Sequence, residues 1–270
     1  MDISFFHIFP FLIIGVAVGF LGGFLGVGGG PLMIPLLTFW AFPAMHIPPE
    51  NIFHLSLGTS LAIIIPISIS GSWAHAKLGN IDWRVVFLLA LPGILGSFLG
   101  SALAAYLKGP MLKTLFGVLL ISIAVQMFFQ KKSWGNDTRH VLPRISIVLI
   151  IGFLVGLFSG FFAVGGAVIA IPLMIRFLGI PLHKAIGNSI AFVFFASLVG
   201  TAGYVYNGWG KPNLPPFTLG YVHLLGWVLA GIPSIFFSQW GAKVARRTNP
   251  FRLRRAFAVV LMIVGFWMMF

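Results

Sequence analysis

The chain contains few charged residues and no cysteine. Only 8% of its 270 residues are charged and 59% are apolar, whereas a soluble domain carries roughly a quarter charged residues. Apolar runs of about 18 residues or more recur along the sequence, and each is a candidate membrane span. The absence of cysteine excludes thiolate catalysis, disulfide bonds and thiolate metal sites. These features predict an all-α, polytopic integral membrane protein with no soluble catalytic domain.

Acidic residues are scarce as well. The four carboxylates are Asp2, Glu50, Asp82 and Asp137, and they fall at the ends of apolar segments or between them. Transporters that bind sodium or relay protons usually keep a carboxylate inside the membrane. We therefore expect no cation carrier, no metal site and no cofactor. We expect no enzyme either, because no nucleophile–base pair is apparent.

Glycine, in contrast, is abundant where a membrane helix tolerates it least. Residues 26–30 read GVGGG within the first apolar stretch, although each glycine lowers helix stability by ~1 kcal/mol relative to alanine. Pro31 follows directly, and proline is favoured in the first turn of a helix. The pattern predicts a helix that is interrupted at the glycines and restarts after them.

The same pattern occurs again in the second half of the chain. The stretch GFLGGFLGVGGGPLMIPLL (19–37) aligns without a gap with GLFSGFFAVGGAVIAIPLM (156–174), and GTS (58–60) aligns with GNS (187–189). Such self-similarity is the signature of an internal repeat. We therefore divide the chain into a first transmembrane repeat (1–130), a basic cytoplasmic linker (131–144) and a second transmembrane repeat (145–270).

Basic residues indicate how often each repeat crosses the membrane, because cytoplasmic loops collect Lys and Arg. With four crossings per repeat, ten of the 17 basic residues lie on one side and seven on the other. With five crossings, fourteen lie on one side, and Lys108, Lys113 and Lys211 lie on the other. The second count predicts a helical bundle of two inverted-topology repeats with both termini outside. Segments 31–44 and 167–178 are then glycine-broken half-helices or re-entrant segments.

Inverted repeats with matching glycine breaks point to a transporter site near the bilayer midplane. A helix that restarts there exposes backbone N–H groups, which attract an anion. The candidate substrate-binding residues at the breaks are Gly28, Gly29, Gly30, Gly165 and Gly166. Small residues also serve close helix packing, and we expect that role for Gly15, Gly19, Gly23, Gly152, Gly156 and Gly160.

The aligned triplets add polar groups to these apolar runs. We assign them to the same binding site, with Asn188 the least easily explained by packing, because a buried amide needs several hydrogen-bond partners. Serine and threonine can instead satisfy their own helix backbone. The triplet residues are Gly58, Thr59, Ser60, Gly187, Asn188 and Ser189, and a possible pathway is formed by Ser70, His75, Thr201, Tyr204 and Arg176. Arg176 is either an interfacial charge or an anion-attracting group at the inner mouth.

The quoted motifs resemble those of the TauE/SafE family of membrane permeases, or sulfite exporters. GGFLGVGGGPLMIPLL, its copy SGFFAVGGAVIAIPLM, the two triplets and the ending LRRAFAVVLMIVG carry this resemblance over essentially the whole chain. The second copy departs from the first, since it has Ala163 and Ala167 in place of Gly26 and Gly30.

The resemblance implies a multi-pass permease of a prokaryotic inner membrane. It implies export of small sulfur-containing anions such as sulfite, sulfoacetate or other organosulfonates, and alternating access at the midplane site follows from the repeat. A channel for a small solute and a membrane scaffold subunit are the alternatives. A homodimer is possible, and the sequence leaves the substrate, the direction and the coupling of transport open.

Overall fold

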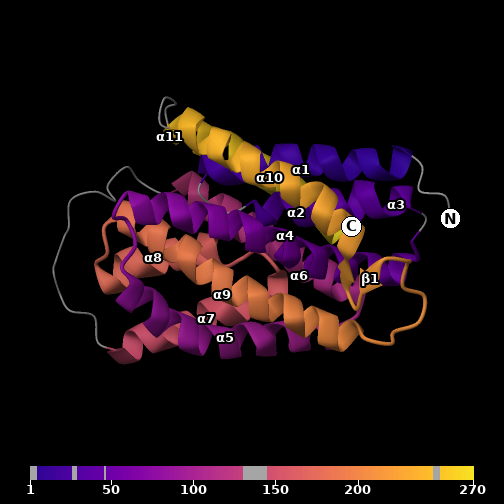
Figure 1. Ribbon diagram of the computed structural model, residues 1–270, viewed down its shortest axis with the longest axis horizontal. Helices are drawn as coiled ribbons and strands as arrows, with labels where there is room; N and C mark the ends of the chain where they lie inside the picture. Colours follow the sequence, from indigo (N-terminus) through magenta and orange to yellow (C-terminus); the bar gives the residue numbers. More distant parts are fainter. Residues whose placement is uncertain (1–4, 26–28, 46, 130–144, 246–249) are drawn as a thin grey trace.

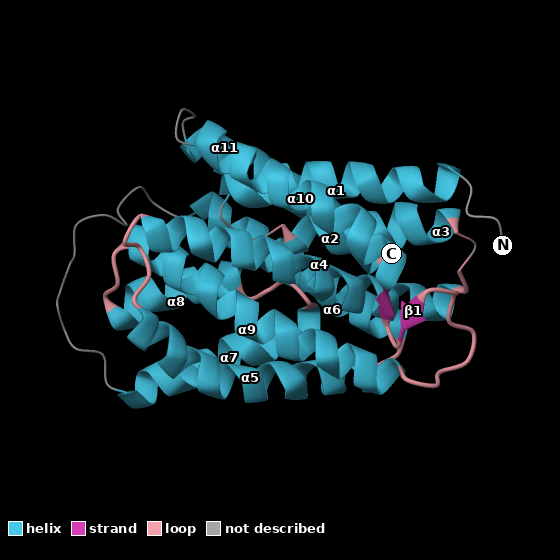
Figure 2. Cartoon of the chain, viewed as in Figure 1, coloured by secondary structure: helices cyan, strands magenta, loops and turns pink. Residues whose placement is uncertain are grey.

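The computed structural model describes residues 5–25, 29–45, 47–129, 145–245 and 250–270, and these residues form an almost entirely helical bundle (Figures 1 and 2). Six of the described helices are long and apolar enough to cross a membrane, which confirms an all-α polytopic membrane protein. In chain order the elements are α1 (Phe5–Leu25), α2 (Gly30–Leu36), the π-helical turn η1 (Leu37–Ala41), α3 (Phe42–Ala44), α4 (Pro49–Lys77), α5 (Trp83–Tyr106), α6 (Gly109–Phe129), α7 (Ile145–Phe162), α8 (Ala167–Leu178), α9 (Leu182–Gly208), β1 (Thr218–Leu219), β2 (Val222–His223), α10 (Leu224–Ala245) and α11 (Pro250–Met269).

Two stretches differ from a simple run of helices. The apolar stretch before α10 forms a small antiparallel hairpin, in which Leu219 pairs with Val222, and the helix starts only at Leu224. Gly220 has a φ of 55° at the turn, a left-handed conformation that suits glycine. Apolar content alone does not separate a short buried hairpin from the start of a helix.

The short segment after the first glycine break is a helix with a π-helical turn in its middle. Pro35 lies inside α2, and a proline ring clashes with the carbonyl group four residues earlier. Just beyond it the backbone widens, and the Phe42 N–H bonds to the Leu37 carbonyl oxygen, five residues back. Such π-helical turns are frequent at functional sites.

Glycine-mediated contacts join two pairs of helices, α1 with α10 and α5 with α7. A Cβ atom added at any of the glycines concerned would overlap the backbone of the partner helix. This confirms the packing role expected for these glycines. On α1, Gly15, Gly19 and Gly23 meet Ala230, Ser234 and Ser238 of α10; on α7, Gly152, Gly156 and Gly160 meet Leu89, Gly93 and Ser97 of α5.

The order of these contacts gives the helix directions. Chain numbers increase together in both pairs, so α1 runs parallel to α10 and α7 runs parallel to α5. Between the pairs lie α4 and α9, with α4 against α10 and α9 against α5 (Figure 1). Gly71 of α4 faces Ile190 of α9, whereas Gly200 faces Leu61. Helices α4 and α9 are therefore antiparallel to each other.

Candidate functional site

The glycine breaks predicted from the sequence are present at the starts of α2 and α8. Gly29 and Gly166 occupy the position just before each helix, with φ values of 76° and 75°, and neither helix has a side-chain cap. The Gly29 carbonyl accepts from the Met33 N–H at 3.1 Å, and the Gly166 carbonyl accepts from the Ala170 N–H at 2.8 Å. The two breaks thus share one geometry. Gly28 lies outside the described residues.

The two breaks meet in the interior of the bundle. A Cβ atom on Gly30 would lie 2.7 Å from the Val164 carbonyl oxygen, so the start of α2 packs directly against the second break. The Ser60 hydroxyl of α4 donates to the Ala163 carbonyl oxygen at 3.3 Å. Gly165 is buried. The structure therefore brings Gly30, Ser60 and the second break together.

The middle residue of each triplet accepts a hydrogen bond from the residue just before a helix. Thr59 Oγ1 accepts from the His223 N–H at 3.0 Å, and Asn188 Oδ1 accepts from the Asp82 N–H at 2.7 Å. Because these N–H groups immediately precede α10 and α5, the two side chains hold equivalent helix starts in the two repeats. The roles explain why polar residues occur here, and only the tertiary structure reveals them.

The remaining triplet residues fall into two kinds. Gly58 packs against the backbone of Tyr221 and Gly187 against the backbone of Asn80, where a side chain would overlap a carbonyl oxygen. Ser189 is fully buried, and its hydroxyl has no hydrogen-bond partner within the described part of the chain. The Asn188 Nδ2 group also has no hydrogen-bond partner among the described residues. Neither residue lines the pocket described below.

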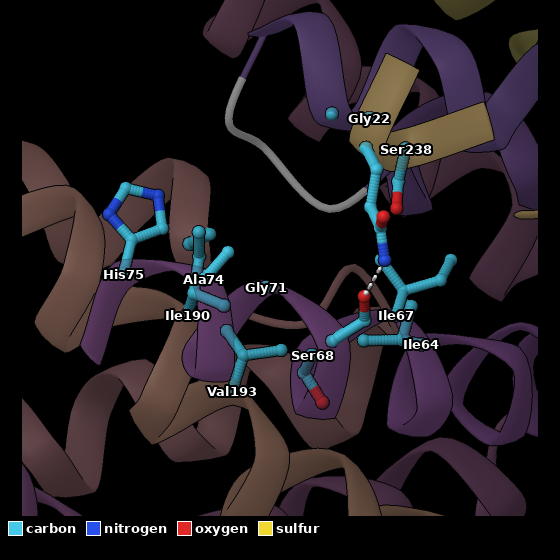
Figure 3. Close-up of a pocket in the computed structure, with 14 residues that line it drawn as sticks. Gly22, Ile64, Ile67, Ser68, Gly71, Ala74, His75, Ile190, Val193 and Ser238 are labelled. Carbon is cyan, nitrogen blue, oxygen red and sulfur yellow. Dashed lines mark hydrogen bonds between the residues drawn. The ribbon is translucent and has the colours of Figure 1, made fainter. Parts of the chain in front are cut away.

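A pocket of about 110 Å³ lies between α1, α4, α9 and α10 (Figure 3). Its lining includes Ser70 and His75, two of the predicted pathway residues. Ala74 and Gln239 are exposed, whereas Ile64 and Val193 are buried, so the pocket deepens toward the middle of the bundle. The full lining is Gly22, Gly23, Ile64, Ile67, Ser68, Ser70, Gly71, Ala74, His75, Ala167, Ile190, Val193, Ser238 and Gln239.

The floor of the pocket reaches the second glycine break. Ala167, the first residue of α8, belongs to the lining. A Cβ atom on Gly165 would lie 3.2 Å from Val193 and 3.4 Å from Ile64, which also line the pocket. The first N–H groups of a helix have no acceptor within it. Beside them, the hydroxyl of Ser159 on α7 is fully buried and unpaired among the described residues, with its Cβ 3.3 Å from a Cβ added at Gly166.

Several polar side chains line the pocket above this floor. Gln239 Nε2 of α10 donates to Ser70 Oγ of α4 at 3.0 Å. The hydroxyls of Ser68 and Ser238 donate to carbonyl oxygens of their own helices, at 2.8 and 2.9 Å. Gln239 and Ser238 were not predicted as site residues. Extending the repeat alignment through α5 and α10 would have signalled Ser238, because its equivalent on α5 is also a serine, Ser97.

The other predicted pathway residues lie apart from this pocket. Tyr204 is fully buried, and its hydroxyl donates to the Phe161 carbonyl oxygen at 3.3 Å. Thr201 lines a separate apolar groove with Tyr206. Arg176 is exposed in the last turn of α8. The structure therefore joins only two of the five pathway candidates in one space.

Charge is distributed unevenly between the ends of the bundle. The pocket lies in the C-terminal halves of α1, α4 and α10 and the N-terminal half of α9. The same end carries basic residues in helix-terminal turns. Of the described carboxylates, Asp82 is exposed at this end, at the start of α5, and Glu50 is exposed at the other end, at the start of α4. The basic residues at the pocket end are Lys77, Arg84, Arg176, Lys184 and Lys243.

One buried histidine lies at the hairpin, near the opposite end. His223 is fully buried and stacks on Phe11 with ring centroids 5.6 Å apart. Its Nδ1 accepts from the Gly226 N–H at 2.9 Å. Burial lowers the pKa of this imidazole to about 4, so the ring is neutral near pH 7.

Comparisons with known proteins point to one family. The model of the family described as "Sulfite exporter TauE/SafE" matches residues 11–268. A probable membrane transporter protein of Haemophilus influenzae is 30% identical, over 94% of this chain and 95% of its own length. A probable membrane transporter protein of Methanocaldococcus jannaschii is 29% identical, over 100% of this chain and 98% of its own length. No solved structure gives a significant match.

Proposed function

The chain belongs to the sulfite exporter TauE/SafE family of membrane transporters, and on this premise we propose that it exports small sulfur-containing anions such as sulfite, sulfoacetate or other organosulfonates. The membrane concerned is the inner membrane of a prokaryotic cell. The observation that carries the proposal is the pocket that runs from the basic end of the bundle to the glycine-broken start of α8.

The helix directions support an inverted repeat. The sequence alignment pairs α1 with α7 and α4 with α9, and α4 and α9 are antiparallel. Trp227 Nε1 donates to the Ala62 carbonyl at 2.8 Å, and Gln239 meets Ser70 further along both helices, so α4 and α10 run the same way. Helices α1, α4 and α10 then oppose α5, α7 and α9. Repeats of this kind bind substrate where discontinuous helices meet.

The start of α8 has the groups that an oxyanion needs. The N–H groups of Ala167 and Val168 lie at a helix N-terminus, where the helix dipole favours negative charge. The Ser159 hydroxyl beside Gly166 lacks a partner in the described structure and can donate to an anion. A cavity of about 150 Å³ holds benzene, so the 110 Å³ pocket suits a solute of a few heavy atoms, such as sulfite.

Electrostatics favours outward movement of an anion. We assign the end that carries Lys77, Arg84 and Lys243 to the cytoplasm by the positive-inside rule, and basic residues there raise the local concentration of anions. The membrane potential, negative inside, drives each negative charge outward by ~2.3 kcal/mol per 100 mV. Efflux therefore needs no coupling ion. This agrees with the scarcity of acidic residues in the sequence.

Alternating access at this site is part of the proposal. The lining residues of the pocket come from one half of the length of the bundle, which favours a carrier that opens on one side over a continuous channel. A scaffold subunit gives no reason for an unpaired buried hydroxyl, that of Ser159, beside the glycine break next to the pocket floor. Such a group lowers stability unless it finds a partner.

Flux into proteoliposomes tests this function. Purified protein is reconstituted, radiolabelled sulfite is supplied, and uptake is measured with an imposed potential that is positive inside. We expect saturable uptake that the potential accelerates and that sulfoacetate, sulfate or thiosulfate competes with to different degrees. Potential-independent, non-saturable uptake, or none above empty liposomes, would contradict the proposal.

A matched pair of serine variants places the site. Ser159→Ala removes the unpaired hydroxyl beside Gly166, and Ser122→Ala removes an exposed hydroxyl that bonds to its own helix at 2.8 Å. A hydrogen bond to a charged group contributes about 1.5–3 kcal/mol, so Ser159→Ala should raise the sulfite concentration for half-maximal flux by about tenfold or more. Ser122→Ala should leave it unchanged. Equal flux in both variants would remove Ser159 from the site.

A further inference from the structure

The pocket of Figure 3 has a closed counterpart in the other half of the bundle. The repeat relates Gly71 and His75 of α4 to Gly200 and Tyr204 of α9. It relates Ser238 of α10 to Ser97 of α5, and the contacts agree, since Gly23 of α1 packs on Ser238 as Gly160 of α7 packs on Ser97. Each lining residue therefore has an identifiable equivalent.

The equivalent residues in the other half are buried and in close contact, with no open space between them in the described structure. Tyr204 and Ser97 are both fully buried, whereas His75 is partly exposed to the open pocket. A Cβ atom on Gly200 would lie 2.7 Å from Ser97 Oγ and 2.9 Å from Leu61 Cδ1. Ser97 Oγ donates to the Ala196 carbonyl oxygen at 2.6 Å. The space that is open beside α4 is thus filled beside α9.

One buried polar group is left unsatisfied by this closure. The Ser159 hydroxyl, whose equivalent Gly22 lines the open pocket, has no partner among the described groups and no exposed surface. Buried hydroxyls are almost always hydrogen-bonded. A second arrangement that hydrates this hydroxyl, or brings it to substrate, explains its presence in an apolar interior.

We propose that Tyr204 is the gate of an outer access path, which is lined by Ser97 and Ser159 and closed in the structure described here. The inference rests on the proposed transport function and adds the residue that closes its outer side. The Tyr204 hydroxyl bonds to the Phe161 carbonyl oxygen on α7, and its own carbonyl accepts from the Tyr221 N–H at 3.2 Å. The ring is therefore held between α7 and the hairpin.

Opening this path means that α9 separates from α7 and α5 at Tyr204. By the symmetry of the repeats, α4 then closes on α1 and α10, and His75 becomes buried at its own end of the bundle, as Tyr204 is buried in the structure described here. The two arrangements exclude each other because α4 and α9 are packed together along their lengths. Weakening the Tyr204 contact should therefore favour the outward-open arrangement at the expense of the inward-open one.

Thiol labelling tests the gate, and the absence of native cysteine means that no background must be removed. Ser97→Cys reports on the outer path and Ser238→Cys on the inner pocket. A charged, membrane-impermeant methanethiosulfonate reagent is added to intact cells for the outer path and to inside-out vesicles for the inner pocket. Labelling rates of each reporter are measured with Tyr204 unchanged, with Tyr204→Phe and with Tyr204→Ala.

We expect opposite changes at the two reporters. Tyr204→Ala should raise the outer labelling of Ser97→Cys about tenfold or more, as when a minor state of about 0.1–10% becomes dominant, and should lower the inner labelling of Ser238→Cys. Tyr204→Phe loses only the bond to Phe161 and should act in the same sense to a smaller degree. Tyr206→Ala, on the same helix and 74% exposed, is the matched control and should change neither rate.

Two outcomes would overturn the gate. Unchanged labelling in folded Tyr204→Phe and Tyr204→Ala would show that Tyr204 closes no path. A rise at both reporters together would show general loosening in place of alternation. Failure of sulfite flux with reciprocal labelling intact would remove the substrate proposal and leave the gate standing, so the two proposals fail separately.

Discussion

Thr59→Val separates a structural role from a ligand-binding role at the first triplet. Valine has nearly the shape of threonine but no acceptor, so the buried N–H of His223 loses its partner at 3.0 Å. Leaving a buried donor unpaired costs about 1–3 kcal/mol. At about 2–4 °C per kcal/mol for a chain near this size, the thermal midpoint in detergent should fall by about 2–12 °C.

The control is Thr114→Val on α6. The Thr114 hydroxyl is exposed and donates to the Pro110 carbonyl oxygen of its own helix at 3.1 Å. Its loss should change the free energy of unfolding by less than about 0.5 kcal/mol. An unchanged midpoint for Thr59→Val, together with a tenfold or greater loss of sulfite flux, would show that Thr59 binds substrate. That result would refute the reasoning from its hydrogen bond.

Three further changes test the packing and the buried groups. Asn188→Leu should lower the thermal midpoint to a similar degree as Thr59→Val, because Asn188 holds the Asp82 N–H as Thr59 holds that of His223; an unchanged midpoint would contradict the equivalence of the repeats. Gly156→Ala should abolish or strongly reduce the yield of folded protein, because the new Cβ overlaps the Gly93 backbone. The control Gly231→Ala should fold normally, because the nearest neighbour of its new Cβ lies 3.8 Å away. His223 has its pKa lowered to about 4 by burial from an ordinary 6.5, so the unfolded chain takes up the proton first and stability should fall as the pH drops from about 6.5 toward 4. His223→Asn should reduce that fall in thermal unfolding measured across this pH range, and an unaltered pH dependence would contradict the assignment.

The elements that sequence patterns determine locally were predictable. The glycine breaks follow from the cost of glycine in a helix and from Pro31, and they are found at Gly29 and Gly166 with matching φ values. The close contacts of α1 with α10 follow from small residues four positions apart, such as Gly15 and Gly19. In both cases the residue type determines the local structure, because glycine permits a positive φ and lets two helix backbones approach closely.

The functions of individual polar residues were less predictable. Thr59 and Asn188 look like ligand groups in an apolar run, but their acceptors hold helix starts that lie far away in sequence. The pocket depends on which faces of four helices meet, so Gln239 gave no signal of its own. The hairpin at Leu219 could not be predicted, because its apolar residues also suit a membrane span.

Counterflow tests the central claim, that the chain is a carrier that exposes one site alternately to the two sides of the membrane. Proteoliposomes are loaded with unlabelled sulfite and diluted into a trace of radiolabelled sulfite. In a carrier, the site that has released unlabelled sulfite outside takes up labelled sulfite on its way back. The labelled sulfite inside the vesicles should therefore rise transiently above its equilibrium level and then decay. A label that approaches equilibrium without an overshoot, while flux itself is normal, would contradict alternating access and indicate a channel.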